Sequence, residues 1–244
     1  MRYAWIERHK NCWPVTVQCE VMNQHGIKAR GKRKFVVTTD SKHNLPIAPN
    51  LLNRNFQPDA PDYVWTSDIT YIQTDAGWLY LAVVLDLYSR QVVGWSMQPH
   101  MQTSLVTDAL RMAWFRRRPE SGLIFHSDRG SQYCSHAFQN VLTDYGMKSS
   151  MPQREAIHYA TSRMWSCHSR KGNCWDNAPT ESLWGSLEVG RLHGMRFETQ
   201  RQATDEVIDW LAYYNHRRLH STLGYISPMQ FEKNWLAAQL RKAA

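Results

Sequence analysis

Two adjoining stretches decide the fold of this 244-residue chain: Val64-Trp-Thr-Ser-Asp-Ile-Thr-Tyr-Ile72 and Trp78-Leu-Tyr-Leu-Ala-Val-Val-Leu-Asp-Leu87. In the first stretch bulky residues alternate with small polar ones, and this period of two predicts a β-strand over residues 65–72. The second stretch is almost continuously apolar, as expected for a strand at the centre of a sheet. Asp75-Ala-Gly77 between them is a turn signal. With a third expected strand over residues 91–97, they predict an antiparallel meander.

The chain beyond this meander alternates between helical and strand patterns. Helices are expected over residues 103–117, where Thr103 can act as the cap, and over residues 136–145, where Gly146 ends the helix. Short strands are expected over residues 123–126 and 147–151. Three strands in a meander followed by alternating helix and strand predict an α/β fold, a mixed five-stranded sheet flanked by helices.

The last third of the chain is expected to be helical. Asn177 caps a helix that carries Pro179 in its first turn, where proline is tolerated. Two further helices are expected over residues 202–214 and 229–241. We therefore divide the chain into a short basic segment and linker, a mixed α/β core and a helical C-terminal segment, over residues 1–61, 62–190 and 191–244.

Charge is distributed unevenly along the chain, whose net charge is +8. Residues 1–60 hold 10 Lys or Arg against 4 Asp or Glu, residues 61–190 hold 11 against 12, and residues 191–244 hold 8 against 5. Two basic flanks around a near-neutral centre suit a polyanion that is held at its edges. The run Lys32-Arg33-Lys34 is the strongest candidate for phosphate contacts, and Arg217 and Arg218 at a helix end are further candidates.

Composition also bears on the compartment. No run of about 18 apolar residues occurs, and the first ten residues lack a signal-peptide pattern, so no membrane span is expected. The five cysteines form no C-x-x-C pair, which indicates free thiols in a reducing compartment. We expect a cytoplasmic protein, and one associated with the nucleoid if the polyanion that it binds is DNA.

Three acidic residues occupy positions that suit metal-dependent chemistry. Asp68 lies in the middle of the first strand on the face of Thr66 and Thr70, Asp128 follows the fourth strand, and Glu181 lies in the first turn of a helix. Clustered carboxylates repel one another and are usually held together by divalent cations, and oxygen-only ligation favours magnesium or manganese. Each residue also has a structural interpretation: ion pairing in a strand, a turn former and compensation of a helix dipole.

Several short sequence motifs, in the same order along the chain, resemble those of insertion-sequence transposases of the second-reading-frame type, which have a retroviral-integrase-like core. These motifs are Asp68-Ile-Thr-Tyr71, Asp86-Leu-Tyr-Ser-Arg90, His126-Ser-Asp-Arg-Gly-Ser-Gln-Tyr133, Gly172-Asn-Cys-Trp-Asp-Asn-Ala178, Glu181-Ser182, Tyr214-Asn-His-Arg-Arg-Leu-His220 and Leu223-Gly-Tyr225. The resemblance covers about residues 62–235. It implies an RNase H-like fold and a catalytic triad of Asp68, Asp128 and Glu181.

The resemblance also implies a reaction and its partners. Two Mg²⁺ or Mn²⁺ ions held by the triad would support DNA cleavage at the element ends and strand transfer. The implied partner is double-stranded DNA, both terminal inverted repeats and target, bound by a homo-oligomer. A DNA-binding protein encoded by an upstream reading frame is a further candidate partner. His126, Arg129 and Asn177 neighbour the triad and could support it or contact phosphates, although a structural role suits each of them equally.

Three departures from the family pattern leave an alternative open. The segment before Gly26 is short, so autonomous recognition of the element ends is in doubt. Residues 152–168 look like an insertion between Asp128 and Glu181, and Glu188 stands where relatives usually place a basic residue. The alternative function is a catalytically weakened DNA-binding remnant or regulator. A nuclease acting on RNA would suit the triad but not the C-terminal motifs.

Overall fold

The structure is a computed structural model, and it describes residues 17, 24, 44–52, 55–152 and 178–243. The chain divides into two compact units, Met1–Val37 and Thr38–Ala244. The architecture below is that of the larger unit. None of its described helices is long and apolar enough to cross a membrane.

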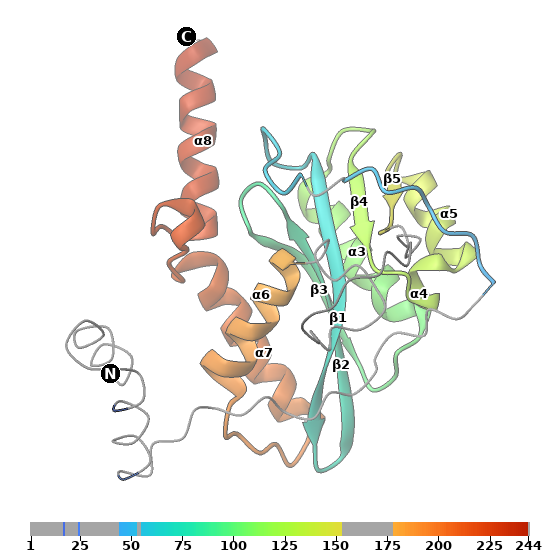
Figure 1. Ribbon diagram of the computed structural model, residues 1–244, viewed down its shortest axis with the longest axis vertical. Helices are drawn as coiled ribbons and strands as arrows, with labels where there is room; N and C mark the ends of the chain where they lie inside the picture. The colour runs from blue at the N-terminus through green and yellow to red at the C-terminus, as the bar shows by residue number, and fades with distance from the viewer. Residues whose placement is uncertain (1–16, 18–23, 25–43, 53–54, 153–177, 244) are drawn as a thin grey trace. The chain divides into compact units, whose positions relative to one another are not determined.

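A five-stranded mixed sheet lies at the centre of the larger unit (Figure 1). Its strands are β1 (Val64–Thr74), β2 (Gly77–Asp86), β3 (Val92–Gln98), β4 (Ile124–Ser127) and β5 (Lys148–Ser150). Their order across the sheet is β3-β2-β1-β4-β5, with β1, β2 and β3 antiparallel and β4 and β5 parallel to β1. The predicted meander and the two additional strands are thereby confirmed. Gly77 permits the tight turn between β1 and β2 because its φ of 114° is unfavourable for other residues.

Helices cover both faces of the sheet (Figure 1). The element order gives α3 (Thr103–Arg117), α4 (Ser131–Cys134), α5 (His136–Asp144), α6 (Ala178–Leu187), α7 (Gln200–His216) and α8 (Pro228–Ala243). A π-helical turn, Glu188–Leu192, continues α6, and a 3-10 turn, Ser221–Leu223, lies between α7 and α8. The mixed α/β architecture expected from the sequence is confirmed.

Two apolar clusters fix the two layers. One face of the sheet packs on α3, α4 and α5 through a cluster that includes Trp65, Ala109 and Phe138. The opposite face packs on α6 and α7 through a cluster that includes Leu81, Val83 and Trp210. Both clusters are almost fully buried, so alternate residues of each strand point into different layers. Residue parity in β1 therefore decides which layer each side chain meets.

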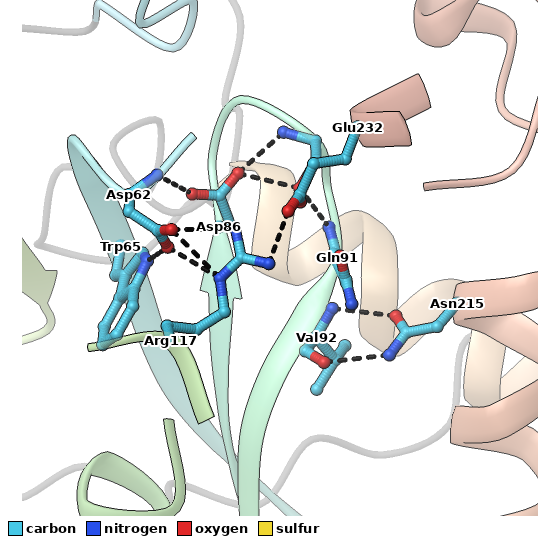
Figure 2. A network of polar contacts seen from close by, with 9 residues as sticks. Asp62, Trp65, Asp86, Gln91, Val92, Arg117, Asn215 and Glu232 are labelled. Carbon is cyan, nitrogen blue, oxygen red and sulfur yellow. Dashed lines mark hydrogen bonds and ion pairs between the residues drawn. The ribbon is translucent and has the colours of Figure 1, made fainter. Parts of the chain in front are cut away.

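A buried polar network ties α3 and α8 to the start of β1 (Figure 2). Arg117 pairs with Asp62 at 2.9 Å and with Glu232 of α8 at 2.5 Å. The Trp65 indole donates to Asp62 at 3.0 Å, and the Asp62 N–H donates to buried Asp86 at 2.8 Å. Five groups from four segments thus hold one another in place.

One local expectation was wrong, and one short helix was missed. Thr103 does not cap α3: the cap is Gln102, and its side chain makes no capping hydrogen bond. The sequence analysis did not predict α4, which starts at Ser131. Four residues are too few for the helical period to be visible in the sequence.

Candidate active site

The register of the sheet places Asp68 and Asp128 side by side. Strands β1 and β4 run parallel, with Thr66 opposite His126 and Ser67 opposite Ser127. One step further along both chains lie Asp68 and Asp128, just where β4 ends. Side chains at matched positions of parallel strands share a face. Both carboxylates therefore lie on the α6 and α7 face of the sheet, at the tip of β4.

Helix α6 crosses this face and brings Glu181 towards the two aspartates. The hydroxyl groups of Thr66 and Thr180 are 3.0 Å apart, which attaches the first turn of α6 to β1. One turn later the Trp184 indole N–H donates to Asp68 Oδ2 at 2.9 Å. Glu181 lies between these two anchors in the sequence and is exposed. The helix is thus fixed beside Asp68 at two points.

The negative charges of Asp128 and Glu181 both act on the carboxyl group of Asp68. Burial, together with the negative charges of Asp128 and Glu181, raises the pKa of Asp68 to about 7. Hydrogen bonds from the Trp184 indole and from the Ile69 N–H act in the opposite direction, because they favour the ionised carboxylate. Asp68 is therefore ionised only in part near neutral pH, and a nearby positive charge would ionise it fully.

The three carboxylates influence one another electrostatically, but they do not lie close enough together to coordinate one metal ion. Among residues 44–52, 55–152 and 178–243, no three His, Cys, Asp or Glu side chains lie close enough to share an ion. The expectation that the triad would converge to metal-bridging distance is not met by all three. The physical reason is mutual repulsion, which keeps like charges apart. Asp128 is oriented by the Gly130 N–H, which donates to its Oδ1 at 2.8 Å.

The other predicted site residues differ in their surroundings. His126 is fully buried and contacts Ser150 Oγ through Nδ1 at 2.9 Å, so it supports the sheet from inside. Burial lowers the pKa of His126 to about 4, and its imidazole is neutral at pH 7. Arg129 donates to the Pro152 carbonyl oxygen at 2.5 Å. Arg217 is exposed, whereas Arg218 is half-buried. Lys32, Arg33, Lys34 and Asn177 lie outside the described residues.

Trp184 is the residue at this site that the sequence reasoning missed. It stands three residues after Glu181 in α6, and residues at that spacing share a helix face. That spacing could have placed an indole N–H beside the acidic cluster. The spacing could not identify Asp68 as the acceptor of this indole N–H, because Asp68 lies 116 positions away in the sequence.

Comparisons with known proteins identify the family. Two models of the integrase core domain match the chain, over residues 58–155 and over residues 165–228. An uncharacterized 31 kDa protein of insertion element IS600 from Shigella sonnei is 43% identical over 210 residues, 86% of this chain and 71% of that protein. Transposase InsF for insertion sequence IS3A from Escherichia coli (strain K12) is 41% identical over 217 residues, 88% of this chain and 69% of that protein. The chain belongs to the insertion-sequence transposases.

The transposase also resembles a solved structure in its fold. A chain from a cryo-electron microscopy structure of the simian T-cell lymphotropic virus intasome, in complex with PP2A regulatory subunit B56 gamma, aligns with a TM-score of 0.55. The alignment covers 94% of the transposase and 73% of that chain at 16% identity. The expected RNase H-like fold and the expected enzyme class, a DNA transposase with an integrase-type core, are both confirmed.

Two departures noted in the sequence have different outcomes. Apart from Pro152, the suspected insertion at 152–168 lies outside the described residues, and the two matched stretches leave residues 156–164 between them. Glu188 is exposed and opens the π-helical turn, so α6 itself ends one residue earlier, at Leu187. The α-helix that carries Glu181 therefore ends just before Glu188.

Proposed function

We propose that Asp68, Asp128 and Glu181 are the catalytic carboxylates of this transposase. Their task is DNA cleavage at the ends of an insertion element, followed by transfer of the 3′ end to new DNA. The observation that carries the proposal is geometric: the β1–β4 register brings Asp68 next to Asp128, and hydrogen bonds of Thr180 and Trp184 hold the helix that carries Glu181 against β1. The charges of Asp128 and Glu181 both raise the pKa of Asp68, in agreement with this arrangement. A carboxyl group with a raised pKa, next to further acids near the end of a strand, is typical of functional sites in α/β sheets.

The donor set suits divalent cations, and we infer that two Mg²⁺ or Mn²⁺ ions bind there. All three side chains offer only oxygen, the donor that these hard cations prefer. Burial and the two neighbouring charges disfavour ionised Asp68, and a cation would reverse that preference. Bound ions would supply charge stabilisation for the attacking and leaving oxygens of an in-line displacement at phosphorus. Asp68 and Asp128 would hold them from the sheet and Glu181 from α6.

The surrounding residues position these carboxylates. Trp184 fixes one oxygen of Asp68 and the Ile69 N–H fixes the other, so the carboxylate plane cannot rotate freely. The Gly130 N–H does the same for one oxygen of Asp128. Such fixed geometry matters because a small misplacement of a reacting group can lower the rate by orders of magnitude.

The proposed partner is double-stranded DNA, both the terminal inverted repeats and the target, bound by a homo-oligomer of the transposase. The basic residues Arg129, Arg217 and Arg218 remain candidates for phosphate contacts, as do Lys32, Arg33, Lys34 and Asn177. An upstream-frame DNA-binding partner is also part of this proposal. We propose that the chain is organised in three parts: a basic segment and linker over residues 1–61, a catalytic core over residues 62–190 and a helical C-terminal segment over residues 191–244.

A cleavage assay on DNA that carries the element's terminal repeat tests the proposal. Wild-type protein should cut in Mg²⁺ or Mn²⁺ and not in chelator. Asp128→Asn should lose cleavage and strand transfer while still binding DNA, because a neutral amide loses a charged ligand. Asp144→Asn, which removes a charge on α5, is the matched control and should cut normally. Cleavage by Asp128→Asn at the wild-type rate would refute the assignment, and binding without cutting by the wild type would favour the weakened-remnant alternative.

A further inference from the structure

A second polar cluster lies outside the carboxylate site, where the β2–β3 turn meets the end of α7. The side chain of Asn215 in α7 accepts a hydrogen bond from the Val92 N–H and donates one to the Val92 carbonyl oxygen, at 2.9 Å each (Figure 2). This pair brings the turn that contains Arg90 next to the segment that contains Arg218 and His220. The centre of the cluster is the Tyr214 ring, which meets the His220 ring edge-on at 4.9 Å.

The cluster contains hydrogen-bonding atoms with no partner. Arg90 Nη1, Arg218 Nε and His220 Nε2 are all buried, and none has a hydrogen-bond partner in the structure. Arg90 uses another nitrogen, Nη2, to donate to the Phe56 carbonyl at 3.0 Å. In the part of the chain that is described, neither Arg90 nor Arg218 forms an ion pair. Buried polar atoms without partners are costly, and two of these three are N–H donors, so the arrangement calls for a ligand.

The unbalanced charge in this cluster is positive. Burial lowers the pKa of His220 to about 4, with the charges of Arg218 and Arg90 acting in the same direction. His220 is therefore neutral at pH 7 beside two guanidinium groups. The acid that acts on Arg90 is Asp86, yet its oxygens already accept from the Asp62 N–H and from the Ser89 N–H and hydroxyl. The cluster thus offers several donors and a net positive charge.

We propose that Arg90, Arg218 and His220 form a phosphate-binding site for the DNA backbone, separate from the carboxylates. This inference rests on the proposed function, since it takes DNA as the ligand. Guanidinium forks match phosphate oxygens in two-bonded geometry, and the neutral imidazole can add a third N–H donor. All three side chains are half-buried, so solvent reaches their outer parts while the inner donors stay dry, where charge-assisted bonds are stronger.

The position of the cluster relates it to the reacting DNA. Tyr214 belongs to the apolar cluster under α6 and α7, on the face of the sheet that also carries Asp68. Asp86, just before the β2–β3 turn, pairs with Trp65, three residues before Asp68 in β1. Three residues of strand span about 10 Å, so the β2–β3 turn that carries Arg90 begins about that far along the sheet from Asp68.

DNA binding measured in chelator tests the proposal without requiring cleavage. Arg218→Gln removes the central donor. Arg201→Gln is the matched control, because it removes the same charge from an exposed position of α7 where Arg201 pairs with Asp205. We expect Arg218→Gln to lose on the order of tenfold in affinity and to lower the slope of log affinity against log salt by about 0.9, one phosphate contact. Arg201→Gln should change both much less. Arg218→Lys should retain the slope but lose affinity, because lysine lacks the fork.

A second measurement covers the case in which Arg218→Gln folds poorly. At constant ionic strength, inorganic phosphate should raise the melting temperature of the wild-type protein and of Arg201→Gln. Equal effects of the two glutamine variants on affinity and slope, or no stabilisation of the wild type by phosphate, would overturn the site. Because these assays exclude divalent cations, their failure would leave the cleavage test of the carboxylates unaffected.

Discussion

Replacing Trp184 by phenylalanine isolates the hydrogen bond that orients Asp68. The indole N–H donates to Asp68 Oδ2 at 2.9 Å, and this bond lowers the pKa of the carboxyl group. A hydrogen bond to a charged group contributes about 1.5–3 kcal/mol, which corresponds to about one to two pKa units. Without it, the pKa of Asp68 should rise from about 7 to roughly 8 or 9. At pH 7 the ionised fraction would fall from about one half to about one tenth or less.

The assay is the single-turnover rate of DNA cleavage across pH 6 to 9 at fixed Mg²⁺, with carboxyl ¹³C shifts of metal-free protein as a direct readout of Asp68. Trp184→Phe should cut far more slowly than the wild type at low pH and approach it at high pH. Trp210→Phe is the matched control, because Trp210 is buried in the same apolar cluster on α7. Its profile should keep the wild-type midpoint. A Trp184→Phe defect that is equal at every pH, or is reproduced by Trp210→Phe, would refute the reasoning.

Three further predictions concern the framework of the site and are checked by urea unfolding. His126 has a folded pKa of about 4 against 6.5 unfolded, so its contribution to stability is present above pH 6.5 and is lost as pH falls towards 4. When the pH is lowered from 7 to 5, the free energy of unfolding of His126→Asn should therefore fall by about 2 kcal/mol less than that of the wild type. An equal fall in both proteins would contradict the burial of a neutral imidazole. Arg117→Ala should cost about 3 kcal/mol because it leaves half-buried Asp62 and buried Glu232 without their counter-ion. Arg117→Lys should cost less, and a loss below about 1 kcal/mol for Arg117→Ala would mean that the network is weak. Gly94→Ala should cost about 1–3 kcal/mol or more, since its Cβ would lie 2.3 Å from the Ala109 carbonyl oxygen, whereas Gly190→Ala meets nothing within 4 Å and should be neutral or stabilising.

The periodic parts of the fold were predictable from the sequence. Alternation around Asp68 and the apolar run after Gly77 predict β1 and β2 because strand period and burial leave a direct trace in residue type. Helix α3 was predicted at its observed bounds, Thr103–Arg117, for the same reason. Its cap was not, because a cap depends on the backbone angles of one residue, and both Gln102 and Thr103 precede the first apolar position.

The contacts of the site were only partly predictable. The parity of Asp68 with Thr66 indicated the correct face of β1, since parity is a local property. The parallel register between β1 and β4, which brings Asp128 beside Asp68, depends on packing between distant segments and has no local signal. The same holds for the meeting of Arg90 with Arg218 and His220. Arg90 lies more than one hundred residues from Arg218 in the sequence, and the Val92–Asn215 contact joins the two segments.

The most direct test of the central claim is the position of the metal ions. Anomalous diffraction from crystals soaked in Mn²⁺, at a concentration that supports cleavage, locates these ions without reference to activity. The account predicts Mn²⁺ bound between the carboxylates of Asp68 and Asp128, with Glu181 moved into contact and the peaks lost in Asp128→Asn. Peaks elsewhere, or none beside Asp68 in crystals of a protein that cuts DNA in Mn²⁺, would contradict it.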